Sequence, residues 1–201
     1  MKRIIFFLTG MLIISSTSFS QSSSNQLLKT LQNKFNSIND LSADFKQSTN
    51  GKINLAGKFF YKKENDLRLE LKNLMIVSDG TTNWSYNKKE NKVIISNYDP
   101  SDPSMISLKR IIDDYPKKCS VSDEKENGNQ VLVLKPGKPG MNFKIAKIYI
   151  NSSELVQKII LTDQNDALVQ IEFSNYKLNQ KLNNSTFTFI PPKGSKVIDI
   201  R

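Results

Sequence analysis

The sequence predicts a mainly β protein of the α+β class, with about ten or eleven antiparallel strands in one strongly curved sheet and helices across its concave side. Three observations lead to this prediction. Most of the chain after residue 40 alternates apolar and polar residues, turn residues separate the alternating runs, and only two stretches have helical spacing instead. Two helices cannot cover a flat sheet of that size, so the sheet must curl around them.

The two helical stretches differ in how they begin. The first starts with a capping box, Ser23 followed three residues later by Gln26, and continues to about residue 39 with Leu27, Leu28, Leu31, Phe35 and Ile38 on one face. The second starts at Asp102-Pro103, an N-cap followed by proline at the first helical position. It places Met105, Leu108, Ile112 and Tyr115 on one face, and Pro116 ends it.

Strands are predicted wherever the period changes to two. Alternation is clearest in residues 53–63, 67–71 and 83–87, and Asp79-Gly80 between two runs is typical of a tight hairpin turn. Pro191-Pro192-Lys193-Gly194 predicts the end of the sheet. The other predicted strands are residues 41–49, 93–95, 118–122, 130–135, 143–150, 154–162, 168–178 and 186–190.

Six large side chains are predicted to face the concave side: Phe59, Tyr61, Leu67, Leu69, Trp84 and Tyr86. If the helices fill the concavity, these residues form an ordinary core. If the helices leave space, they line an apolar pocket that opens at one edge. Periodicity leaves both alternatives open and favours the packed core, because apolar stripes usually mean core.

The first twenty residues have the layout of a secretory signal peptide. Lys2 and Arg3 precede an apolar run over residues 4–14, and Ser18 and Ser20 are small residues placed before a cut at Gln21. The apolar run is too short to span a membrane comfortably. We therefore expect residues 1–20 to be removed and residues 21–201 to form a single domain outside the cytoplasm.

Composition excludes several kinds of functional site. The chain has no histidine and one cysteine, Cys119, so catalytic triads, Cys-His pairs, histidine-ligated zinc and an intramolecular disulfide are excluded. The acidic residues Asp99, Asp102, Asp113 and Asp114 match no calcium-loop spacing, so we expect no metal. A secreted hydrolase with two catalytic carboxylates remains the enzymatic alternative, although no such pair stands out.

The formal charge of +10 is scattered along the chain, partly as lysine pairs such as Lys62-Lys63, Lys88-Lys89 and Lys117-Lys118. Such pairs usually form a solvated face that keeps a protein in solution. For an exported protein we expect no nucleic-acid partner.

Four segments resemble the LolA family of periplasmic lipoprotein carriers: Leu41–Gln47, Gly57–Lys63, Val77–Tyr86 and Phe187–Gly194. They follow the family's order and spacing, and they extend over nearly the whole chain after the signal peptide. The resemblance implies an open half-barrel whose helices form a lid over a hydrophobic cavity. It therefore favours the pocket over the packed core.

The resemblance also implies a function. Such a carrier takes the acyl chains of lipidated proteins from an inner-membrane lipoprotein-releasing ABC transporter to an outer-membrane acceptor, without catalysis or a cofactor. A periplasmic binding protein or sensor for another lipid or hydrophobic molecule is the alternative. We expect a monomer, because a shuttle between two membranes gains nothing from a fixed partner.

The resemblance assigns roles to individual residues. The six inward side chains are expected to bind acyl chains, and the helix with Met105, Leu108 and Ile112 is expected to be the lid. Lys63 holds the position at which the family usually has arginine followed by proline, a latch that binds lid carbonyls. Lysine lacks the planar fork of arginine, so Lys63 is either a weaker latch or a solvated strand end.

Overall fold

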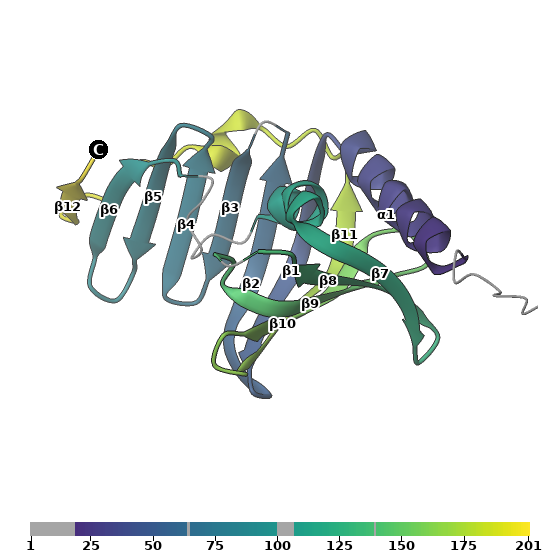
Figure 1. Ribbon diagram of the computed structural model, residues 1–201. Coiled ribbons are helices and arrows are strands. Elements are labelled where there is room, and N and C mark those ends of the chain that lie inside the picture. The colour runs from purple at the N-terminus through teal and green to yellow at the C-terminus, as the bar shows by residue number, and fades with distance from the viewer. Residues whose placement is uncertain (1–18, 64, 100–106, 139) are drawn as a thin grey trace, which may run out of the picture.

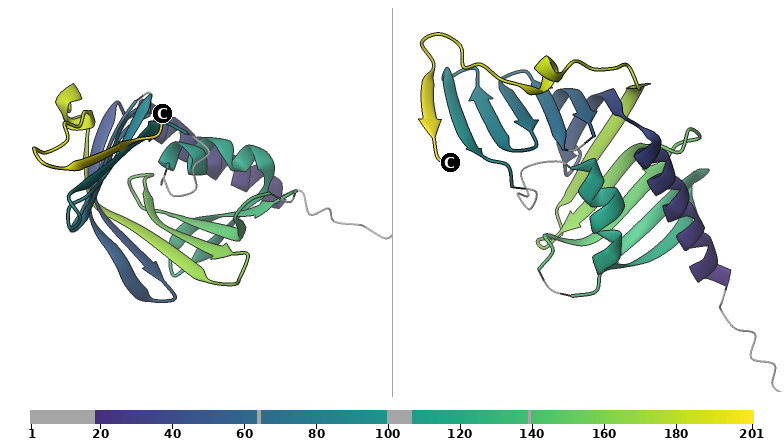
Figure 2. Two further views of the ribbon diagram at one scale, coloured as in Figure 1. Left: turned by 90° about the vertical axis from the view of Figure 1, so that its left-hand side faces the viewer. Right: turned by 90° about the horizontal axis from the view of Figure 1, so that it is seen from above.

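The computed structural model describes residues 19–63, 65–99, 107–138 and 140–201. One twelve-stranded sheet dominates the molecule, in the order β12-β6-β5-β4-β3-β2-β1-β11-β10-β9-β8-β7 (Figure 1). The sheet curves around helix α1 (Phe19–Ser37) and a short helical segment, as Figure 2 shows from two further directions. The predicted mainly β fold with an open, strongly curved sheet is therefore confirmed.

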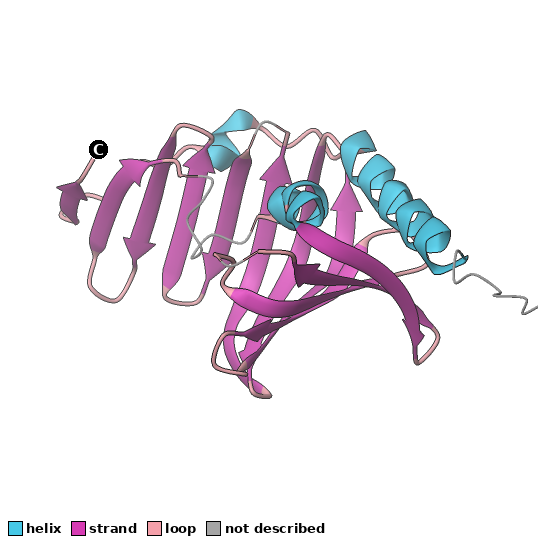
Figure 3. Cartoon of the chain, viewed as in Figure 1, coloured by secondary structure: helices cyan, strands magenta, loops and turns pink. Residues whose placement is uncertain are grey.

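Most strands fall where alternation placed them and are longer than predicted in places, but the strand at residues 74–79 was not predicted (Figure 3). Their bounds are β1 (Asp40–Thr49), β2 (Lys52–Lys62), β3 (Asp66–Leu71), β4 (Leu74–Asp79), β5 (Thr82–Asn87), β6 (Lys92–Asn97), β7 (Cys119–Glu126), β8 (Asn129–Pro136), β9 (Phe143–Ile150), β10 (Val156–Asp163), β11 (Leu168–Leu178) and β12 (Lys196–Asp199).

The C-terminal part of the prediction is wrong in two respects. The expected strand at residues 186–190 is instead the short 3-10 helix η3 (Asn184–Phe187) followed by extended chain. The sheet also does not end at Pro191-Pro192, because the chain returns as β12 and pairs with β6 in parallel. Prolines without N–H groups keep the intervening segment out of the ladder, and the strand forms only beyond them.

The helices also differ from their predicted bounds. Helix α1 begins at Phe19, ahead of the predicted cap at Ser23. The second helical segment is a π-helical turn, η1 (Arg110–Asp114), followed by the 3-10 turn η2 (Pro116–Lys118). The Tyr115 N–H donates to the Arg110 carbonyl at 2.8 Å, which is a π-type bond. The predicted start of this helix, with Met105, lies outside the described residues.

The main core fills the concave side of the sheet. Leu31 and Phe35 of α1, and Ile38 just after it, are each at most 6% exposed and belong to one apolar cluster with the inner faces of the strands. The rings of Phe45, Phe59 and Phe173 join β1, β2 and β11, with Phe173 5.9 Å from Phe45 and 5.4 Å from Phe59. Helix and sheet thus bury one continuous core between them.

Gly57 marks a close approach of β2 and β3. A Cβ atom at this position would lie 1.9 Å from the backbone oxygen of Glu70 on β3 and 3.1 Å from a Leu71 methyl group. No side chain fits there without parting the strands. The curvature of the sheet between β2 and β3 therefore depends on glycine at this position.

Candidate functional site

Four of the six predicted inward residues form one apolar wall on the concave side. Phe59 pairs with Leu69 across β2 and β3, and Tyr61 pairs with Leu67, so all four side chains share a face. They are between 0% and 8% exposed. The Tyr61 ring also lies 5.2 Å from Phe35 of α1. Burial, with a smaller contribution from the Asp113 carboxylate, raises the pKa of Tyr61 to about 12.

The segment that runs from Leu108 through η1 covers this wall and is called the lid here. Leu108, Ile111 and Ile112 are all at most 6% exposed and belong to the main core. A void of about 20 Å³ remains between the lid and the wall. Another of about 10 Å³ remains between the lid and α1. Each has room for about one water molecule, so neither of these two voids could hold an acyl chain.

Side-chain packing holds the lid, with one cross-link from α1. The Gln32 Nε2 group donates to the Ile112 carbonyl at 3.0 Å. The Asp113 carboxyl on the lid is partly buried, which raises its pKa, although Lys117 acts in the opposite direction. Nothing in the sequence distinguishes Gln32 from other polar residues of an amphipathic helix, so this contact could not be predicted from the sequence.

Trp84 and Tyr86 do not face the concavity, and this part of the prediction is wrong. In the ladder Trp84 pairs with Val77, which pairs with Arg68, the outward neighbour of Leu67 and Leu69. Paired residues share a face, so Trp84 lies on the convex side. Tyr86 lies two residues further along β5, so it is on the convex side as well. Alternation within a strand does not fix its face after a turn, because a shift of one residue reverses every side chain.

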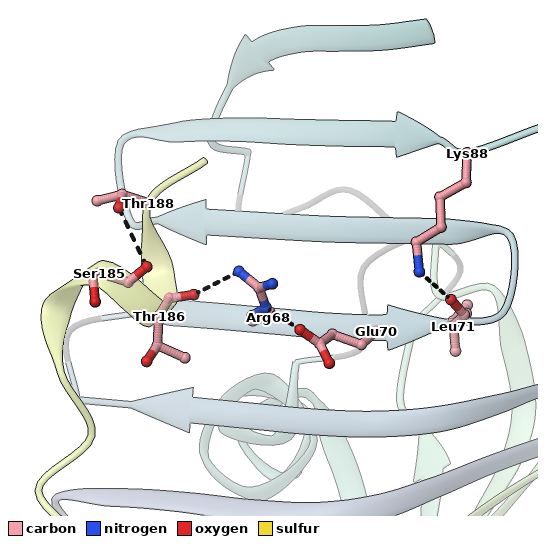
Figure 4. Close-up of polar contacts among 7 residues, drawn as sticks. All are labelled: Arg68, Glu70, Leu71, Lys88, Ser185, Thr186 and Thr188. Atoms are coloured by element: carbon pink, nitrogen blue, oxygen red, sulfur yellow. Dashed lines mark hydrogen bonds and ion pairs between the residues drawn. The ribbon is translucent and has the colours of Figure 1, made fainter. Parts of the chain in front are cut away.

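A C-terminal strap, residues 179–190, runs along the convex side and contacts Tyr86. Phe189 lies 5.6 Å from the Tyr86 ring, and Phe187 is 1% exposed. Arg68 points outward as predicted and donates to the Thr186 carbonyl at 3.2 Å, while its Nε donates to Glu70 at 2.6 Å (Figure 4). The strap thus encloses a second small core on the outside of the sheet.

The strap is fastened at its start by Asp40 and Lys62. The Asp40 carboxylate is 3% exposed and accepts from the backbone N–H groups of Gln180 at 2.8 Å and Lys181 at 3.1 Å. Lys62 donates to the Leu182 carbonyl at 3.3 Å and to the side chain of Asn184. These contacts satisfy a buried charge and orient the chain across β2.

Lys63 lies at the end of β2 with an exposed side chain. Its backbone N–H donates to the Asn39 carbonyl at 2.9 Å. Within the described part of the chain, its ammonium group has no hydrogen-bond or ion-pair partner. The latch role of Lys63 therefore stays a prediction.

Two further properties concern only the described residues. No group of three or more cysteine or acidic side chains there could hold a metal ion. No helix in the described ranges is both long enough and apolar enough to cross a membrane.

Comparison with known proteins gives related sequences and a related fold. Residues 36–190 match the family model described as outer membrane lipoprotein carrier protein LolA. An outer-membrane lipoprotein carrier protein of Legionella pneumophila (strain Corby) is 27% identical, covering 96% of this chain and 97% of that protein. The namesake of Francisella tularensis subsp. novicida (strain U112) is 28% identical, with 84% and 86% covered.

Among solved structures, an uncharacterized conserved protein from Thermus thermophilus has a similar fold. Its TM-score is 0.60 at 12% identity, covering 89% of this chain and 99% of that one. This likeness concerns the fold alone. The family model, in contrast, matches most of the sequence, including β1 to β11 and the whole strap. The chain therefore belongs to the LolA family of outer membrane lipoprotein carrier proteins.

Proposed function

We propose that this protein binds the acyl chains of lipoproteins beneath its lid and ferries them from the inner to the outer membrane. The observation that carries the proposal is the apolar wall of Phe59, Tyr61, Leu67 and Leu69, closed by a short helical segment. Family membership supports it, because relatives across the family are named as carriers of lipoproteins.

Acyl chains can enter only if the lid leaves, because the two voids beneath it hold about one water molecule each. Burial of the Leu108, Ile111 and Ile112 side chains stabilises the closed lid by about 2 kcal/mol for each residue. A sixteen-carbon acyl chain gains about 12 kcal/mol on full transfer from water, at about 0.8 kcal/mol per methylene. Burying the acyl chain therefore gains more free energy than is lost when the three lid side chains are displaced. When the lid returns, the burial of its side chains offsets part of that gain and so favours release.

The cellular setting belongs to the same proposal. Residues 1–20 direct export and are cleaved, and the protein works as a monomer in the periplasm. It receives cargo from an inner-membrane lipoprotein-releasing ABC transporter and delivers it to an outer-membrane acceptor. Transfer breaks no covalent bond, so the function requires neither a catalytic residue nor a cofactor.

A photocrosslinking experiment tests the proposal. We would place p-benzoylphenylalanine at Leu69 in the wall and, as a control, at Ile53, which is 63% exposed at the far end of β2. A triacylated lipopeptide is expected to crosslink at position 69 and not at position 53. Equal crosslinking at both positions, or none at position 69, would contradict the proposal. Crosslinking of free fatty acid but not of lipopeptide would favour a binding protein for other lipids.

A further inference from the structure

A larger cavity lies outside the concave wall, where the lid runs into β7. Its volume is about 820 Å³, within the range of small-molecule sites. The η1 and η2 segments, the start of β7 and the connection between β8 and β9 form its walls. The lining residues are Arg110, Tyr115, Lys117, Lys118, Cys119, Ser120, Gly137, Lys138, Gly140, Met141 and Asn142.

The floor of this cavity is apolar. Tyr115, Cys119 and Met141 are half-buried and pack against the main core. The Cys119 Sγ and Met141 Sδ atoms are 3.6 Å apart, and the Tyr115 ring lies 5.3 Å from Phe143. Burial raises the pKa of the Cys119 thiol, so the floor carries no charge at neutral pH. Sulfur-containing side chains are polarizable and adapt to flexible apolar ligands.

The rim of the cavity is basic. Arg110, Lys117, Lys118 and Lys138 line it, and none of its described lining residues is acidic. Carboxylates lie close by: Asp114 is 3.5 Å from the Lys117 ammonium, and Asp113 also interacts electrostatically with Lys117. The Arg110 guanidinium lies 5.4 Å from the centre of the Tyr115 ring. Cations gathered around a concave, low-dielectric surface repel one another and attract an anion.

The two sides of the rim are held together by the backbone. The Gly137 N–H donates to the Lys118 carbonyl at 3.1 Å, so the connection between β8 and β9 stays beside the end of η2. This contact continues the pairing of β7 with β8 and places the backbone of Lys118 beside the connection that carries Lys138. The backbone positions of these two rim lysines are therefore tied to the sheet.

We propose that this cavity binds one lipid molecule with an anionic phosphate headgroup, with the phosphate at the basic rim and the tail on the sulfur-lined floor. A free phosphate would leave most of the volume empty and the floor unused. A zwitterionic headgroup would bring a cation to a rim that already repels cations. The site is separate from the concave wall, so it goes beyond the proposed transport of lipoproteins.

Methionine methyl NMR of the exported, delipidated protein tests the site directly. Met141 reports on the floor, and Met75 on β4 serves as an internal control, because it pairs with Tyr86 beneath the strap. The probes are dihexanoyl-phosphatidylglycerol, dihexanoyl-phosphatidylcholine and inorganic phosphate. We expect the anionic lipid to shift the Met141 signal and leave Met75 unchanged, while the other two probes bind at least about tenfold more weakly.

Charge variants separate the rim from the general surface charge. Lys118→Gln with Lys138→Gln is expected to weaken phosphatidylglycerol binding about tenfold. The matched control, Lys89→Gln with Lys193→Gln, removes two exposed cations elsewhere and should leave binding unchanged.

Four results would overturn the inference: equal binding of both lipids, an equal effect of phosphate alone, a Met141 signal that no probe moves, or equal weakening by both double variants. The lipopeptide crosslink at position 69 is read out separately. Failure of this inference is therefore distinguishable from failure of the proposed function.

Discussion

The change Gly57→Ala is expected to destabilise the protein by about 3 kcal/mol, through one added methyl group. The new Cβ would lie 1.9 Å from the Glu70 oxygen, whereas ordinary contacts begin at 3.4 Å, so β2 and β3 would have to part by about 1.5 Å. The obstacle is backbone, which cannot rotate away. Parting the strands weakens about two ladder hydrogen bonds, with about 1–3 kcal/mol lost for each buried group left unpaired. Alanine also lowers the conformational entropy of the unfolded chain, which offsets about 0.5–1 kcal/mol of this loss.

Urea unfolding followed by circular dichroism measures this change, with Gly137→Ala as the matched control. A Cβ at Gly137 would meet only the Lys118 oxygen at 3.6 Å, an ordinary contact. This second substitution should therefore be neutral or slightly stabilising. A Gly57→Ala protein within about 0.5 kcal/mol of the parent would refute the reasoning, since surface substitutions of no consequence fall in that range.

Four further predictions concern the lid, the outer core and acid stability. Gln32→Ala removes the hydrogen bond to the Ile112 carbonyl, so lid amides should exchange hydrogen faster and lipopeptide uptake should speed up; unchanged exchange would contradict a cross-linking role. Trp84→Ala should destabilise the fold by about 2 kcal/mol yet leave lipopeptide crosslinking at Leu69 intact, because Trp84 lies on the convex side. Lys63→Leu should alter the release of bound lipopeptide, and unchanged transfer kinetics would reject the latch. Hydrogen bonds from Lys147 and Tyr149 lower the pKa of Glu126 to about 2. The ionised carboxylate therefore stabilises the fold above about pH 4.5, and this stabilisation is lost as the pH falls towards 2. Glu126→Gln should flatten that part of an acid titration followed by circular dichroism.

The strand content was predictable because alternation is a local property. Residues 53–63 and 67–71 alternate so regularly that β2 and β3, and the wall formed by Phe59 and Leu69, follow from spacing alone. Turn residues such as Asp79-Gly80 gave the strand breaks. These signals depend on neighbours in sequence, which is why they could be identified without coordinates.

Relations between strands were not predictable in the same way. Trp84 and Tyr86 looked like further members of the wall, yet the register across β3, β4 and β5 turns them outward. β4 carries apolar side chains on both faces, with Ile76 inward and Val77 outward, so its sequence does not show which side is covered. The strap and the parallel pairing of β12 depend on contacts between residues far apart in sequence, and no local pattern encodes them.

The outer core would have a mechanical consequence under the proposed function, in which the inner side is emptied and refilled. Val77 and Val93 are fully buried on the convex side, under a strap fastened independently of the lid by Asp40, Lys62 and Arg68. When the lid lifts, the strands from β2 to β6 keep a packed backing on their other surface. The sheet can therefore keep its curvature while one ligand leaves and the next one binds, and it need not collapse in the unliganded state.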